Sequence, residues 1–151
     1  MHWPRGIPAR GELRHTPGHV IELVPTILEI AGGRPFETWQ GQPVPPAPGK
    51  NLVPHFGNDG TATHGELCWL HEDNRALRVG DWKIVAADND APWELYDLSA
   101  DRSESQNVAG EKPEKVGQLS ALWTRMTEEF GTLVRQDLPP ANDHAKMGEG
   151  R

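Results

Sequence analysis

The sequence has very little cysteine, no run of basic residues and no long apolar run. Cys68 is the single cysteine among 151 residues, which excludes an internal disulfide and a zinc framework built on cysteine pairs. No apolar stretch approaches the roughly 20 residues that span a membrane. The N-terminal stretch MHWPRGIPARGELRH also lacks the apolar core of an export signal. We therefore expect no membrane partner, and the missing signal favours a cytoplasmic location.

The charge balance is acidic. The chain has 15 Lys and Arg against 22 Asp and Glu, a net charge of −7. Because phosphate binding needs clustered basic side chains, we expect no nucleic-acid partner. The 16 glycines and 14 prolines indicate many turns and loops. The length suits one ordinary domain.

The first regular element is predicted within HVIELVPTILEIAGG. Val24, Ile27, Leu28 and Ala31 are spaced as one apolar stripe of a helix. Pro25 is tolerated only in the first turn, so the helix should begin near Glu22. Gly32-Gly33 should end it, and the stripe should serve packing. The proline- and glycine-rich stretch 34–64 is predicted to be a long extended connection.

Four short runs between turn residues predict an antiparallel sheet. They lie at 66–71, 76–79, 82–86 and 93–98. A helix that begins at Pro113 should cover one face through an apolar stripe, and Gly131 is its predicted end. After Leu138 the chain should be frayed. The predicted fold class is α+β, a small four-stranded antiparallel sheet covered by a C-terminal helix.

Few residues suggest chemistry by themselves. Cys68 lies inside a strand pattern, which favours a buried, inert thiol. His71 stands at a strand end beside Glu72, Asp73 and Asn74, where either a functional cluster or a solvated polar hairpin is expected. Pairs such as Asp88-Asn89 do not have the spacing of a calcium loop and suit turns.

Three stretches together resemble type I sulfatases of the alkaline-phosphatase-like superfamily. The first stretch combines HWPRGIP with GELRHTPGHVIELVPTILEIAGG, the second is WLHEDNRALRVGDWKIVAA, and the third is WELYDLSADRSESQNVA. Their order and spacing also fit, over about residues 2–123. Three positions depart from the usual pattern: Glu22 replaces Asp as a poorer helix cap, Asp73 replaces Gly, and Arg102 replaces Pro.

The resemblance implies a hydrolase of sulfate esters that uses a formylglycine and a calcium ion. In the family both belong to a large N-terminal α/β domain that precedes W-P-x-G-I. Cys68 is followed by Trp69-Leu70-His71-Glu72, without the proline and arginine of the maturation motif. We therefore assign no catalytic residue, no metal ligand and no cofactor to this chain, and its enzymatic activity stays an open question.

The resemblance also implies a division of the chain. Residues 1–33 are expected to be the end of the large α/β domain, 34–64 the connection, 65–131 the C-terminal subdomain, and 132–151 a disordered tail. His71, Asn74 and Arg75 are predicted to line a substrate rim, with Arg75 and Arg78 drawing in an anionic ester. In the alternative, Asn74 shapes a turn and Arg75 pairs with a carboxylate.

Three hypotheses for the function remain open. In the first, the chain is a fragment of an arylsulfatase-like enzyme and is inactive alone. In the second, it is a non-catalytic module that uses apolar surface to bind a sulfatase catalytic domain or a second copy of itself. The third is independent hydrolysis at His71 and Glu72.

Overall fold

The fold is seen in a computed structural model, which describes residues 3, 6–7, 10–57, 59–60 and 63–137, without the side chains of 135–137. The chain divides into two compact units, residues 1–65 and 66–151, and each is described by itself. The frayed tail predicted after Leu138 lies outside the described residues. Among the helices that are described, none is both long and apolar enough to cross a membrane.

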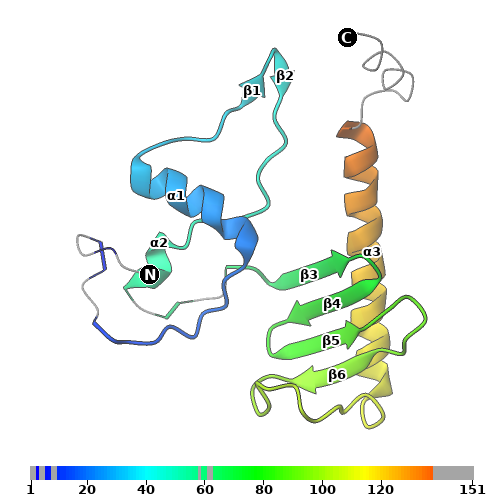
Figure 1. The fold of residues 1–151 in the computed structure, drawn as a ribbon. Coiled ribbons are helices and arrows are strands. Elements are labelled where there is room, and N and C mark those ends of the chain that lie inside the picture. Colours follow the sequence, from blue (N-terminus) through cyan, green and yellow to red (C-terminus); the bar gives the residue numbers. More distant parts are fainter. Residues whose placement is uncertain (1–2, 4–5, 8–9, 58, 61–62, 138–151) are drawn as a thin grey trace, which may run out of the picture. The chain divides into compact units, whose positions relative to one another are not determined.

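The first unit is built around one short helix (Figure 1). A 3-10 turn, η1 (Val20–Glu22), leads into α1 (Leu23–Ala31). Gly32 ends α1 in the left-handed conformation at φ 67°, and the Gly33 amide donates to the Leu28 carbonyl at 2.8 Å. The predicted start near Glu22 and the predicted glycine stop are both confirmed, because proline and glycine act locally.

Most of the α1 stripe has no covering partner among the described residues. Val24 and Ile27 of the predicted stripe are 63% and 62% exposed, whereas Glu22 and Thr26 are buried. The Leu52 amide donates to Thr26 Oγ1 at 2.9 Å. The neighbouring loop therefore holds α1 by a hydrogen bond on its polar side, and Val24 and Ile27 are left in solvent.

Glu22 stands at the N-cap position of α1, but its side chain makes no cap hydrogen bond to that helix. His19 is the N-cap of η1, and its Nδ1 accepts from the Ile21 amide at 3.3 Å. Glu22 Oε2 accepts from the His19 amide at 2.5 Å, and Glu22 Oε1 lies 3.1 Å from His64 Nε2. Glu22 is therefore the second half of a capping box, and it also ties the helix to the end of the following loop.

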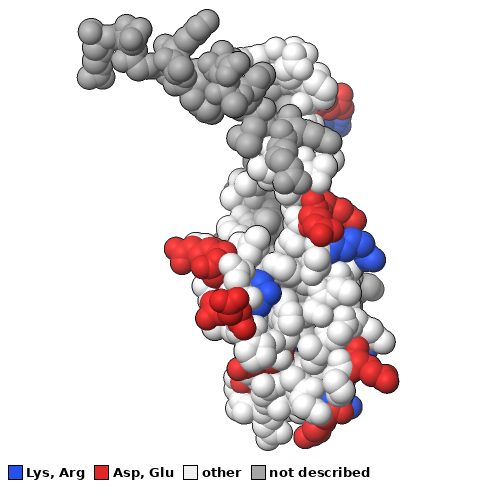
Figure 2. All heavy atoms as spheres, turned by 90° about the vertical axis from the view of Figure 1, so that its right-hand side faces the viewer, with Lys and Arg blue, Asp and Glu red and all other residues white. Residues whose placement is uncertain are grey.

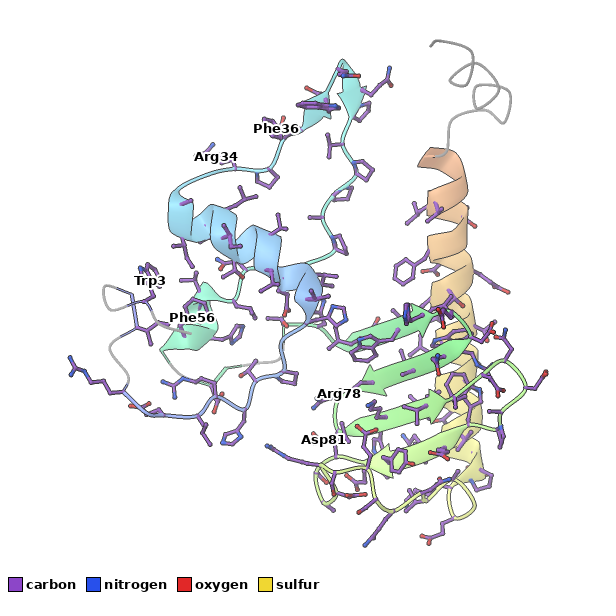
Figure 3. The ribbon with its side chains drawn as sticks, in the orientation of Figure 1. Trp3, Arg34, Phe36, Phe56, Arg78 and Asp81 are labelled. Atoms are coloured by element: carbon purple, nitrogen blue, oxygen red, sulfur yellow. The ribbon has the colours of Figure 1, made fainter. Side chains whose placement is uncertain are left out.

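Trp3, Gly6 and Ile7 of the first sequence stretch are joined by backbone hydrogen bonds. The amides of Gly6 and Ile7 both donate to the Trp3 carbonyl, at 3.0 and 2.8 Å. A Cβ at Gly6 would lie 2.1 Å from the Trp3 ring, so only glycine fits there. The Trp3 ring meets Phe56 edge-on at 6.3 Å (Figure 3).

The connection 34–64 has more structure than its composition predicted. It holds the hairpin strands β1 (Thr38–Trp39) and β2 (Gln42–Pro43) and one helical turn, α2 (Val53–Phe56). The hairpin turns at Gln40 and Gly41, with φ of 49° and 79°. Proline content alone does not reveal such a turn, because it depends on a left-handed residue beside the glycine.

The second unit confirms the predicted fold class (Figure 1). Its strands are β3 (Glu66–His71), β4 (Asn74–Val79), β5 (Trp82–Ala86) and β6 (Glu94–Asp97). They form an antiparallel meander in the order β3-β4-β5-β6. The helix α3 (Pro113–Asp137) runs along one face and starts at the predicted proline.

The core lies between this sheet and α3. Cys68, Leu77, Ile84 and Leu95 are cross-strand partners in one row, and the last three are completely buried. Leu119 of α3 packs against them, with Leu122, Trp123 and Met126 around it. The apolar face of the sheet and the apolar stripe of α3 therefore pack against each other, as the sequence predicted.

The predicted end of this helix is wrong. α3 passes through Gly131 and continues to Asp137. An interior glycine costs a helix only about 1 kcal/mol relative to alanine, so it does not stop a helix whose neighbours favour the helical state. Leu133 and Val134 of the added turns are 55% and 57% exposed, and Phe130 just before Gly131 is 47% exposed.

Candidate functional site

A cavity of about 400 Å³ opens on the sheet face opposite α3. Ala76 and Val85 form its floor, with Trp69 on one side and Glu94 on the other; the four are neighbours in one row across β3, β4, β5 and β6. Because two small side chains lie between two large ones, the surface is hollowed. His71, Asn74 and Arg75, the predicted rim residues, all line this cavity.

The β3–β4 hairpin presents His71 and Asn74 at one end of the cavity. The two residues are directly paired, and both are exposed. Glu72 turns the chain at φ 54°, and Asn74 Nδ2 donates to the His71 carbonyl at 3.4 Å. Asn89 Nδ2 donates to Asp73 Oδ1 at 2.5 Å. Asn74 thus shapes the turn, and His71 projects from a hairpin braced by the neighbouring loop.

Arg75 is held by aromatic rings and backbone carbonyls. Its guanidinium carbon lies 4.7 Å from the Trp93 ring centre and 5.7 Å from that of Trp123. One terminal nitrogen donates to the Asp88 and Ala91 carbonyls, at 2.9 and 3.1 Å. These rings and carbonyls take the place of the carboxylate with which Arg75 was expected to pair in the alternative reading. Arg75 therefore fixes the loop whose Ala91 belongs to the cavity wall.

Arg78 lies outside the cavity. Its Nε donates to the Gly80 carbonyl at 2.8 Å, and its guanidinium lies 4.0 Å from the Asp81 carboxylate. Figure 3 shows both residues at the β4–β5 turn. On the molecular face of Figure 2, basic groups form small separate patches beside acidic ones.

Glu94 is a cavity residue that sequence reasoning missed. The Tyr96 hydroxyl donates to Glu94 Oε2, and this hydrogen bond, together with burial, raises the pKa of Tyr96 to about 12. Tyr96 thereby orients the carboxylate at the cavity edge. Trp69 was noted only as part of a strand pattern. That Glu94 and Trp69 lie in one row across the sheet is known only once the four strands are aligned, because the strand register sets which distant residues become neighbours.

The polar residues of the third sequence stretch have structural roles. Asp101 accepts from the amides of Gln106 and Ser105, both at 2.8 Å, and the Gln106 bond is the main cause of its lowered pKa. Asn107 Oδ1 accepts from the Leu95 amide at 3.1 Å. Lys83 binds Glu104 at 2.6 Å. These contacts close the loop between β6 and α3.

Cys68 faces the core and not the cavity. It is half-buried and packs against the core cluster, and burial raises the pKa of its thiol. Within the described ranges, no group of three or more His, Cys, Asp and Glu side chains is placed to hold a metal ion.

We expect the Cys68 thiol to react slowly in the folded chain. Since the thiolate is the nucleophile and burial disfavours it, alkylation by iodoacetamide at neutral pH should be roughly tenfold or more slower than in urea. Raising the pH to 9 should speed the reaction of the folded chain. The rates are measured by intact-mass spectrometry, and equal rates with and without urea would contradict the placement of this thiol.

Comparison with known proteins relates most of the chain to sulfatases. An uncharacterized sulfatase of Schizosaccharomyces pombe is 32% identical over 125 residues, which are 78% of this chain and 22% of that protein. Arylsulfatase K of Xenopus laevis is 35% identical over 109 residues, 66% of this chain and 20% of its own. The chain thus spans about a fifth of the length of these curated relatives. No protein-family model matches the sequence.

Solved structures share the fold. The crystal structure of Ps i-CgsB matches 93% of this chain and 29% of its own, with a TM-score of 0.55 and 24% identity. The structure of BT1596, a 2-O GAG sulfatase, matches 82% of this chain and 27% of its own, with a TM-score of 0.50 and 19% identity.

Proposed function

Because this chain is a partial region of a sulfatase, we propose that it is the C-terminal part of an arylsulfatase-type sulfuric ester hydrolase and that it does not hydrolyse sulfate esters by itself. The observation that carries this proposal is the setting of Cys68. Its thiol packs against the core beneath α3, on the sheet face away from the cavity. The residues after it, Trp69-Leu70-His71-Glu72, also differ from the formylglycine motif. The formylglycine and calcium expected in the whole enzyme would then come from sequence outside this chain.

We propose that the cavity is the part of this chain that meets the substrate. His71 and Asn74 stand at its end, and its Trp69 wall and Ala76 floor are apolar. Such a site would contact the organic part of an ester more than the sulfate group. Arg75 would act indirectly, since its guanidinium is already bound by Trp93 and two carbonyls.

The purified chain should not release phenol from an aryl sulfate, with or without added calcium. The reason is that the described residues offer neither an aldehyde nucleophile to attack the sulfur and displace the phenol nor a cluster that would hold a cation against the sulfate oxygens. Release is followed by absorbance, and an intact mass should show Cys68 unconverted. The His71→Ala variant serves as control. If the wild-type chain hydrolyses the ester and the variant does not, the chain is an independent hydrolase and the proposal is overturned.

A non-catalytic, partner-binding role is the second candidate. It is favoured by an exposed aromatic pair, Trp39 of β1 and Phe36 just before this strand, which are 62% and 72% exposed with ring centres 6.0 Å apart. Exposed aromatic side chains of this kind are common anchors in protein interfaces. We propose a sulfatase catalytic domain as this partner, because the chain spans 22% of the sulfatase that it matches.

A further inference from the structure

The first unit contains a completely buried carboxylate with a histidine beside it. Glu22 is 0% exposed, and its Oε1 lies 3.1 Å from Nε2 of His64, whose side chain is itself largely buried. The other carboxylate oxygen accepts from the His19 amide at 2.5 Å. Oε1 and Nε2 have no hydrogen-bond partner among the described residues, so the contact between them is one of charge. Because a buried charge is costly without an opposite charge beside it, the carboxylate needs the protonated ring.

This pair ties the end of the connection 34–64 to the start of the first helix. Earlier in the same connection, the Leu52 amide donates to Thr26 Oγ1 at 2.9 Å, a contact between uncharged groups. At the end of the connection the tie is the charged contact of His64 with Glu22. His64 stands two residues before β3. The contact that depends on a proton therefore lies where the chain leaves the first unit.

We infer that the Glu22–His64 pair is a pH-sensitive latch, which holds the end of the connection on the first helix while the pair carries a proton and releases it when that proton is lost. The inference is independent of the proposed function, because the cavity and Cys68 belong to the other unit. Both partners of the latch are described residues of one unit, so a longer chain around them would not remove their contact.

Counting protons gives the direction of the pH dependence. The closed pair holds one proton, on the ring or on the carboxylate. When the latch is open, a free histidine keeps a proton below about pH 6.5 and loses it above, while a free carboxylate is ionised above about pH 4.3. Closing is therefore independent of pH between these two values. Above about pH 6.5 only the closed form holds the proton, so closing becomes up to about tenfold less favourable for each pH unit.

The other ionisable side chains near the latch do not produce this dependence. Lys50 Nζ donates to the Thr63 carbonyl at 2.7 Å, and a lysine is ordinarily charged up to about pH 10. His19 Nδ1 accepts from the Ile21 amide at 3.3 Å, which requires that nitrogen to be unprotonated. Protonation of His19 would therefore weaken the helix start, so its effect has the opposite sign. His55 of α2 has a buried Nδ1 without a hydrogen-bond partner among the described residues, and it is the competing histidine.

Hydrogen exchange of the full chain at pH 6 and pH 8, followed by mass spectrometry, tests the latch. Protection factors remove the intrinsic effect of pH on exchange, and they are compared for peptides within 19–31 and 49–57, with a peptide of α3 as the internal reference. In the wild-type chain the protection of the first-unit peptides should fall roughly tenfold or more from pH 6 to pH 8. The protection of the α3 peptide should change less than about twofold, because the latch belongs to the other unit.

Three variants make the result decisive. Glu22→Gln keeps an oxygen for the His19 amide but removes the charge, so the protection should no longer depend on pH. His64→Gln removes the titrating ring and should already show at pH 6 the low protection that the wild-type chain shows at pH 8. His55→Gln is the matched control and should keep the full dependence.

The inference is overturned if wild-type protection is equal at the two pH values, or if the dependence survives in His64→Gln. It is also overturned if His55→Gln removes the dependence. Should Glu22→Gln leave the 19–31 peptide unprotected at both pH values, the two histidine variants decide the question, because neither substitution touches the helix itself.

Discussion

Replacing Leu77 by alanine should lower the free energy of unfolding of the second unit by about 3–5 kcal/mol. Leu77 is completely buried at the centre of the sheet, between Cys68 and Ile84 in the cross-strand row and beneath Leu119 of α3. Alanine removes the side chain from a site whose walls come from three strands and a helix, so the surroundings cannot close the gap. A loss of this size is a large part of the usual stability of a domain.

Urea denaturation followed by tryptophan fluorescence measures this loss. Leu70→Ala is the matched control, because Leu70 of β3 lies on the same face of the sheet as Leu77 but is 57% exposed. It should cost less than about 1 kcal/mol, since most of its surface is already in water. Similar losses for the two variants would show that α3 does not cover the sheet at Leu77.

Replacing Arg75 by methionine should lower the free energy of unfolding by about 2–3 kcal/mol, an unusual loss for an arginine near the surface. Methionine keeps much of the apolar stem. It removes the ring contacts with Trp93 and Trp123 and leaves the Asp88 and Ala91 carbonyls without their donor. A desolvated cation over an aromatic ring contributes about 1–2 kcal/mol, and each lost hydrogen bond about 1. The buried Nε of Arg75 has no hydrogen-bond partner among the described residues, and its burial offsets part of the stability that these contacts contribute.

Arg78→Met is the control for Arg75. Arg78 is also on β4, but its contacts are one carbonyl in the turn and the exposed Asp81 at 4.0 Å. Exposed pairs of this kind contribute little, so the cost should be below about 1 kcal/mol. Both variants are compared by urea denaturation, and the Arg75 variant should also shift the emission of Trp93 and Trp123. Equal stability of the two variants would mean that Arg75 does not hold the 88–91 loop.

The local features of this chain were readable from its residues. Pro25 and Gly32 limit α1 because one restricts the backbone before a helix and the other permits the left-handed stop. The strands of the second unit alternate between large apolar and other residues, so their number and order followed from the pattern. Gly131 was misread because the same residue type is tolerated inside a long helix.

The candidate site was only partly readable. Its hairpin end, with His71 and Asn74, follows from one short stretch of sequence. Its other side, Glu94, comes from β6 and becomes a neighbour of Trp69 only through two intervening strands. Arg75 follows Asn74 directly, but successive side chains of a strand point to opposite faces, so its guanidinium reaches the tryptophans on the α3 side.

The sequence by itself determined the secondary structure of the second unit, the α+β class and the resemblance to sulfatases, because these depend on residues close together along the chain. The tertiary structure decided that Arg75 is a clamp beside the cavity, that Glu22 is a buried partner of His64, and that the stripe of α1 stays exposed. Burial depends on which distant surfaces are present to cover a side chain. A periodic pattern shows that a helix has an apolar face, but only the packed chain shows whether that face has a partner.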